Sequence, residues 1–186
     1  ALTINAGVQV GDADQTYTFP TLAAPFTQKQ QGEETSRIAF VDLNWSQHYA
    51  NDSQLSLQTY LAYSDWHYIN YNPTLLTFGA DTQYDFKVFG DWETSAGLGY
   101  KVTRDHIDSS TELVYDPKDF TAHFGDAFLQ TTVPLIPSDL ELTLGSKVET
   151  SSYEPFLLSP STKLAWYPSR FTTLWTSYGR AFRIPS

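Results

Sequence analysis

The sequence predicts an all-β fold, a transmembrane antiparallel up-and-down β-barrel, and three observations lead to this prediction. Polar and apolar residues alternate with a period of two, short and long connections alternate along the chain, and aromatic residues gather near the ends of the alternating segments. The alternation predicts about nine strands, and because these alone would leave two unpaired sheet edges that lipid does not tolerate, we expect them to form one section of a larger barrel. We expect residues 1–186 to be a single unit, a fragment of a larger barrel domain.

Alternation is clearest in residues 76–88 and 92–103. In the first segment an apolar row that starts at Leu76 and Phe78 alternates with a polar row that contains Asp81. Because successive side chains of a strand point to opposite faces, each segment presents one apolar and one polar face. Residues 54–63 and 140–149 repeat this pattern, and weaker alternation predicts further strands in residues 2–10, 39–45, 127–133, 162–166 and 171–182.

The connections between these segments alternate in length. Turn-forming residues make short connections, whereas the intervening connections are longer and polar. Barrels of the outer membrane have short periplasmic turns and longer extracellular loops, and their strands are long enough to cross a bilayer at a tilt. We expect short turns at residues 50–52, 89–91, 137–139 and 168–170, and long loops at residues 11–35, 65–73, 105–119 and 152–159.

Aromatic residues make up 16% of the chain, and many of them lie near the ends of the predicted strands. Aromatic girdles mark the two interfaces of a lipid bilayer. A soluble β-sandwich that binds carbohydrate through its aromatic residues is the alternative, because a sandwich also alternates polar and apolar residues. The residues expected at the interfaces are Trp45, Trp66, Tyr84, Phe86, Trp92, Trp166 and Trp175.

Composition excludes several classes of function. The formal net charge is −10 and the 11 basic residues are scattered, so we expect no nucleic-acid partner. The chain has no cysteine and its 4 histidines lack metal-site spacing, so we expect no metal and no cofactor. No motif marks a nucleophilic serine beside a histidine, so we name no catalytic residue and expect no enzyme. A small outer-membrane enzyme or adhesin is a further alternative.

Several segments resemble the central part of the barrel in TonB-dependent outer-membrane receptors. The resemblance lies in residues 142–149, 160–168 and 173–186, and the ending Gly-Arg-Ala-Phe-Arg-Ile-Pro-Ser is its most specific piece. Residues 51–60 and 96–104 are similar to successive strands of the same family, so the resemblance covers residues 36–186.

This resemblance implies a barrel of about 22 strands that contains an N-terminal plug. It implies uptake of a scarce solute, such as a ferric siderophore, across the bacterial outer membrane with energy supplied through TonB. The implied partners are outer-membrane lipid, the remaining barrel strands, the plug, the TonB complex and a small-molecule chelate. We expect neither plug nor coupling segment within these residues. Cobalamin, sugars and other chelates are alternative cargoes in the family.

Two groups of residues are candidates for binding. The first consists of charges on the polar faces of the strands, which we expect to face the lumen and the plug: Asp81, Asp85, Lys87, Glu93, Lys101, Glu141, Lys147 and Glu149. The second consists of expected ligand contacts, namely aromatic residues of the long connection 11–35 and arginines of the family-like ending that would suit an anionic ligand: Tyr17, Phe19, Phe26, Arg180 and Arg183.

Overall fold

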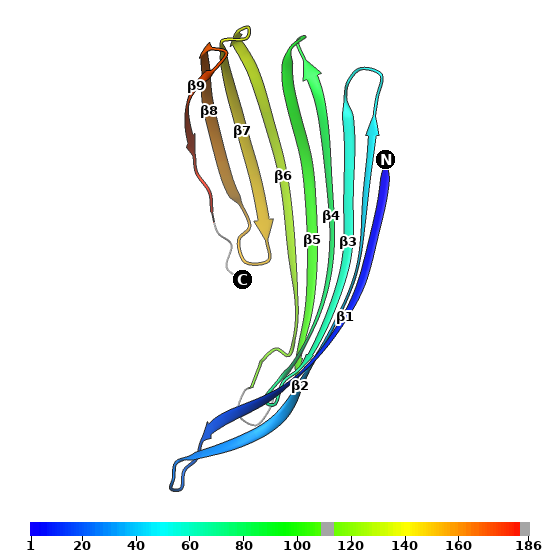
Figure 1. Cartoon of the computed structure of the whole chain (residues 1–186), viewed down its shortest axis with the longest axis vertical. Coiled ribbons are helices and arrows are strands. Elements are labelled where there is room, and N and C mark those ends of the chain that lie inside the picture. The colour runs from blue at the N-terminus through cyan, green and yellow to red at the C-terminus, as the bar shows by residue number, and fades with distance from the viewer. Residues whose placement is uncertain (109–113, 183–186) are drawn as a thin grey trace.

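The computed structural model describes residues 1–108 and 114–182, and this part of the chain forms one antiparallel sheet in which each strand pairs with the next (Figure 1). The predicted all-β, up-and-down fold is confirmed. The soluble sandwich is excluded, because all strands belong to a single sheet. Within the described ranges, no helix is long and apolar enough to span a membrane. The nine strands are β1 (Leu2–Pro20), β2 (Thr27–His48), β3 (Gln54–His67), β4 (Asn72–Val88), β5 (Trp92–Asp108), β6 (Asp119–Ile136), β7 (Leu140–Ser151), β8 (Leu157–Ser169) and β9 (Thr172–Gly179).

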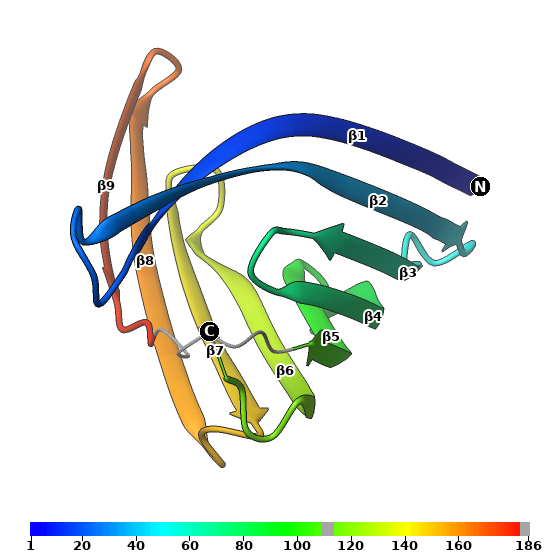
Figure 2. The same ribbon diagram turned by 90° about the horizontal axis from the view of Figure 1, so that it is seen from below.

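The sheet is strongly curved but does not close (Figure 2). Strands β1 and β9 form its two edges, and each has a single neighbouring strand. An edge strand carries a row of unpaired N–H and C=O groups, which the hydrocarbon of a bilayer does not tolerate. Both edges therefore need further strands in a membrane.

The register gives the sheet two chemically different faces. Asp81 of β4 pairs with Gly99 of β5, which pairs with Asp126 of β6, and paired residues share a face. One position along, Thr82 pairs with Leu98 on the opposite face. We call the first the polar face and the second the apolar face.

The apolar face is exposed along the whole sheet. Val8 of β1 is 79% exposed, Leu98 of β5 is 62% exposed and Leu144 of β7 is 49% exposed. The only buried apolar side chains among the described residues belong to Ala122 and Ala165, because a single sheet has nothing packed against it. An apolar surface of this extent is far larger than soluble monomers expose, so lipid is the solvent that suits it.

The four short turns lie together at the upper end of the sheet in Figure 1, as predicted. They span residues 49–53, 89–91, 137–139 and 170–171. Asp52, Phe89 and Ser138 adopt positive φ angles of 61°, 50° and 66° in these turns, and Gly90 has a φ of 92°. The other end of the sheet carries the remaining connections.

The predicted long loop at residues 11–35 is wrong. Strand β1 continues to Pro20 and β2 starts at Thr27, so only residues 21–26 form the turn, and the hairpin projects well beyond the rest of the sheet (Figure 1). The apolar row ends at Val10 and the same face continues with Asp12 and Asp14. Both faces of the projecting hairpin are thus polar, so periodicity gives no signal there. The β3–β4 and β7–β8 connections, residues 68–71 and 152–156, are also shorter than predicted, because their strands extend further.

Aromatic residues of the apolar face cluster near the short turns. Tyr84 and Phe86 stack with their ring centroids 5.0 Å apart, and Phe89 lies edge-on to Trp92 at 5.3 Å. The expected position at the lipid interface is wrong for Trp66, because Trp66 pairs with Ser36 on the polar face. It is wrong also for Trp175, which pairs with Ala165 on that face.

Candidate functional site

The register places all eight predicted charges on the polar face. Lys147 of β7 lies between two carboxylates, with its Nζ 3.5 Å from Asp126 Oδ1 and 3.0 Å from Glu149 Oε1. Asp126 was not among the predicted charges, because it lies just before the alternating segment of β6. Pairing across β5, β6 and β7 brings it into this group.

Two glycines of β5, Gly97 and Gly99, let neighbouring side chains on the polar face lie directly against the backbone. A Cβ on Gly97 would lie 2.3 Å from Phe128 Cε1, so the Phe128 ring lies flat against the sheet at this point. A Cβ on Gly99 would lie 2.5 Å from Asp126 Oδ2 and 2.7 Å from Asp81 Oδ1. The two carboxylates therefore approach the bare backbone from both neighbouring strands.

A hollow of about 390 Å³ lies on this part of the polar face. Tyr60, Asp81 and Lys101 line it together with Phe124 and the group around Lys147. The ammonium group of Lys101 lies 4.3 Å from the centroid of the Phe124 ring, a cation–π contact. The wall thus offers acidic, basic and aromatic groups to whatever fills the space in front of it.

A second group lies at the long-connection end of the polar face, and we call it the tyrosine cluster. It brings together residues from β1, β2, β3 and the connection between β3 and β4: Tyr17, Phe19, Glu34, Trp66, Tyr68 and Tyr71. All six side chains are half-buried.

The rings of the tyrosine cluster form two stacks. Tyr17 and Phe19 stack at 6.1 Å, and Tyr68 stacks with Trp66 at 5.9 Å and with Tyr71 at 4.8 Å. The Tyr17 hydroxyl donates a hydrogen bond of 2.5 Å to Glu34 Oε1. A carboxylate therefore lies among aromatic rings.

Glycine positions the connection that carries Tyr68 and Tyr71. A Cβ on Gly32 of β2 would lie 2.7 Å from Ile69 Cγ1, so Ile69 packs directly on the backbone of β2. The Tyr68 N–H also donates to the Tyr71 carbonyl at 3.1 Å, which closes a tight turn. The connection therefore lies over β2, on the face that carries Glu34.

The Glu34 carboxylate contributes to raised pKa values of two tyrosines in the tyrosine cluster. The hydrogen bond to Glu34 is the main cause that raises the pKa of Tyr17, and the negative charge of Glu34 adds to it. Burial is the main cause that raises the pKa of Tyr68, followed by its charge interactions with Tyr71 and Glu34. Both phenols therefore stay protonated at neutral pH and serve as hydrogen-bond donors.

The family model described as "TonB dependent receptor-like, beta-barrel" matches residues 2–186. The chain belongs to this family. Proteins of the family are outer-membrane β-barrels of bacteria that act as transport receptors, and in such barrels the apolar face contacts lipid while the polar face lines the interior. No curated protein matches the chain.

Solved structures of receptors share the fold at low sequence identity. The siderophore receptor PirA from Pseudomonas aeruginosa superposes with a TM-score of 0.68 and 14% identity, covering 100% of this chain and 38% of that one. The alcaligin outer membrane receptor FauA from Bordetella pertussis gives a TM-score of 0.51 and 16% identity, covering 95% and 32%. A mutant of the ferric enterobactin receptor PfeA from Pseudomonas aeruginosa gives 0.50 and 14%, covering 97% and 34%. This chain thus spans roughly a third of the length of these receptors.

The predicted ligand contacts of this receptor barrel are only partly brought together. Tyr17 and Phe19 join the tyrosine cluster, whereas Phe26 lies at the tip of the β1–β2 hairpin with 63% of its surface exposed. Arg180 follows β9, and its guanidinium carbon lies 4.4 Å from the centroid of the Phe182 ring. Arg183 lies outside the described residues.

Four members of the tyrosine cluster were missed by sequence reasoning: Glu34, Trp66, Tyr68 and Tyr71. Glu34 meets Tyr17 only through the pairing of β1 with β2. The dense aromatic composition of residues 66–71 was the one local signal that pointed to this part of the receptor barrel.

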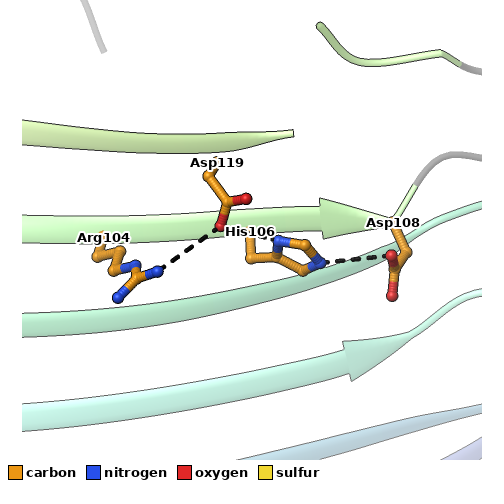
Figure 3. Close-up of polar contacts among 4 residues, drawn as sticks. All are labelled: Arg104, His106, Asp108 and Asp119. Atoms are coloured by element: carbon orange, nitrogen blue, oxygen red, sulfur yellow. Dashed lines mark hydrogen bonds and ion pairs between the residues drawn. The ribbon is translucent and has the colours of Figure 1, made fainter. Parts of the chain in front are cut away.

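A third group lies on the outer face of the barrel, beyond the apolar row of β5 (Figure 3). His106 Nδ1 lies 3.0 Å from Asp119 Oδ1 and His106 Nε2 lies 3.3 Å from Asp108 Oδ1, with Arg104 Nη2 3.9 Å from Asp119. The hydrogen bond with Asp119 is the main cause that raises the pKa of His106, against an opposing effect of burial.

This outer-face group joins β5 to β6. The two carboxylates lie on opposite sides of the His106 ring and do not converge on one point. Across residues 1–108 and 114–182, no three His, Cys, Asp or Glu side chains are arranged to hold a metal ion. The group therefore acts as an ion-pair link at the loop end of the barrel.

Proposed function

We propose that the chain belongs to an outer-membrane receptor that takes up a scarce solute such as a ferric siderophore, with energy supplied through TonB. The tyrosine cluster carries this proposal. It gathers half-buried rings at the loop end of the polar face, which is the extracellular end in barrels of this type. Binding sites for small molecules combine aromatic walls with a few polar groups that fix the orientation of the ligand.

The polar face supports a second part of the same proposal. The group around Lys147 and the bare backbone at Gly99 would contact the plug, and strands beyond β1 and β9 would complete the barrel. Polar contacts of this kind hold a plug without a hydrophobic seal, so the plug is able to move during transport. The family architecture favours this role.

Among the predicted ligand contacts, the structure favours Tyr17 and Phe19. Both belong to the tyrosine cluster, next to Tyr68 and Tyr71. Ligand contact by Phe26, Arg180 and Arg183 stays a prediction.

Growth assays test this proposal in the complete receptor. We expect a strain that depends on the receptor to use at least one ferric siderophore in iron-limited medium, and to lose this growth when TonB is deleted. Tyr68→Ala should weaken uptake by about tenfold or more, because aromatic anchors dominate ligand affinity. Tyr49→Ala, at the short-turn end, is the control and should leave uptake unchanged. Uptake that is independent of TonB would overturn the proposal.

A further inference from the structure

The charge of the tyrosine cluster limits the ligands that suit it. Tyr17 binds one oxygen of Glu34, and no hydrogen bond within the described residues reaches the other oxygen, Oε2. In the same part of the chain, no lysine or arginine forms an ion pair with Glu34. Among the described residues, the Glu34 carboxylate therefore has no cationic partner, and one oxygen is free to accept a hydrogen bond.

A small hollow adjoins this carboxylate. It has a volume of about 180 Å³, and Glu34, Trp66 and Tyr68 contribute to its lining. Glu34 is the one charged residue of the lining whose side chain is on this face of the sheet, because Asp12 faces the opposite side. The hollow is too small for a whole iron chelate but large enough for a flexible arm of one.

The rings add to the negative potential of the tyrosine cluster. The face of an aromatic ring attracts cations, and tyrosine and tryptophan do so more strongly than aliphatic residues. Trp66 and Tyr68 line the hollow and stack with nearly parallel rings, Tyr71 stacks on Tyr68, and Tyr17 lies next to the carboxylate. An anionic group placed here would meet a like charge and the electron-rich ring faces together.

We propose that the tyrosine cluster selects a metal chelate that carries a protonated amine, with the ammonium group bound to Glu34 and the chelate resting on the rings. This inference rests on the proposed function and names the chemical class of its ligand. An ammonium group supplies the N–H donors that Glu34 lacks, and charge-assisted hydrogen bonds of this kind are stronger than neutral ones. Chelates with a net negative charge are disfavoured.

Binding to the full-length receptor, followed by quenching of its tryptophan fluorescence, tests the proposal with three probes. The first is a linear ferric trihydroxamate with one primary ammonium group, and the second is the same chelate with that amine acetylated. The third is a ferric tris-catecholate, which is anionic. We expect the ammonium form to bind about tenfold more tightly than its acetylated form, as expected for one hydrogen bond between charged groups.

Two variants identify the responsible carboxylate. Glu34→Gln still accepts the hydrogen bond of Tyr17 but loses the charge, so the two trihydroxamates should then bind equally. Glu33→Gln is the matched control, because Glu33 is the next residue on β2 and faces the opposite side of the sheet. It should leave the preference unchanged.

The outcomes separate this inference from the proposed function. Equal binding of both trihydroxamates to the unaltered receptor, or tighter binding of the tris-catecholate, overturns the inference and leaves a siderophore receptor. A preference that survives in Glu34→Gln also overturns it. If the receptor binds none of the three probes and supports growth on no ferric chelate, the proposed function fails as well.

Discussion

Gly97 is the position where an added methyl group should damage the barrel most. Its Cβ would lie 2.3 Å from Phe128 Cε1 and 2.7 Å from the carbonyl oxygen of Thr82. The Phe128 ring is able to turn away, but the Thr82 carbonyl belongs to the backbone of β4 and moves only if the pairing of β4 with β5 is distorted. Such overpacking costs about 1–3 kcal/mol, so we predict that Gly97→Ala lowers the free energy of unfolding by about 2 kcal/mol.

Guanidinium unfolding of the purified receptor, followed by its heat-dependent gel mobility, measures this loss. Adding Phe128→Ala to Gly97→Ala should recover only the share that is due to the ring, because the contact with the Thr82 carbonyl persists. Gly179→Ala is the control, since its Cβ would meet nothing closer than 3.8 Å. If Gly97→Ala changes stability by no more than Gly179→Ala does, the contacts at Gly97 do not limit the packing of β4 and β5.

Three further predictions concern the lipid face, the tyrosine cluster and pH. Leu98→Lys should destabilise the barrel by about 2–4 kcal/mol, because it places a charge in lipid, whereas Gln58→Lys on the polar face should be tolerated. Gly32→Val should displace Ile69 and with it the β3–β4 connection, which weakens ligand binding by about tenfold in a fluorescence titration. His106 has a raised pKa, so its contribution is complete below the unfolded value of 6.5 and is lost as the pH rises through the folded value. Hydrogen-exchange protection of residues 100–108 should therefore fall as the pH rises above 6.5.

Matched measurements check these three predictions. If Leu98→Lys and Gln58→Lys lower the unfolding midpoint equally, the assignment of the two faces is wrong. Gly145→Val on β7 is the comparison for the cluster, because it lies away from the cluster and its Cβ would come closest to the Ser161 hydroxyl, at 2.8 Å. Protection that falls with pH just as steeply in His106→Asn would rule out His106 as the titrating group.

The sequence predicts the parts of this fold in which the two faces of the sheet have different solvents. Leu76 and Asp81 lie in a segment that has lipid on one side and a polar interior on the other, so a period of two identifies it. The hairpin that contains Asp12 and Asp14 extends β1 beyond the apolar row, where both faces are polar. Alternation of apolar residues carries no information in such a segment, and we predicted a loop there.

The binding residues were less predictable than the strands. Tyr17 was identified as a ligand contact because it is an aromatic residue in a polar segment, although its partner Glu34 depends on the register of the β1–β2 hairpin. Trp66 was assigned to the lipid interface, because composition alone does not say which face a strand-end aromatic residue occupies. Asp126 was missed for a similar reason, since its role comes from Lys147 on the neighbouring strand.

Alternate residues of β4 and its neighbours should lie in lipid and in a polar interior, because strands of this barrel family cross a membrane. Because residues 1–186 contain no cysteine, single nitroxide labels at successive positions from 76 to 81 report this directly. We measure the accessibility of each label to oxygen, which partitions into lipid, and to a water-soluble nickel complex. Labels at Leu76, Phe78 and Ala80 should favour oxygen, and labels at Thr77, Gly79 and Asp81 should not. Accessibility without a period of two, or labels at Leu76 and Phe78 that the nickel complex reaches freely, would show that β4 does not have one face in lipid.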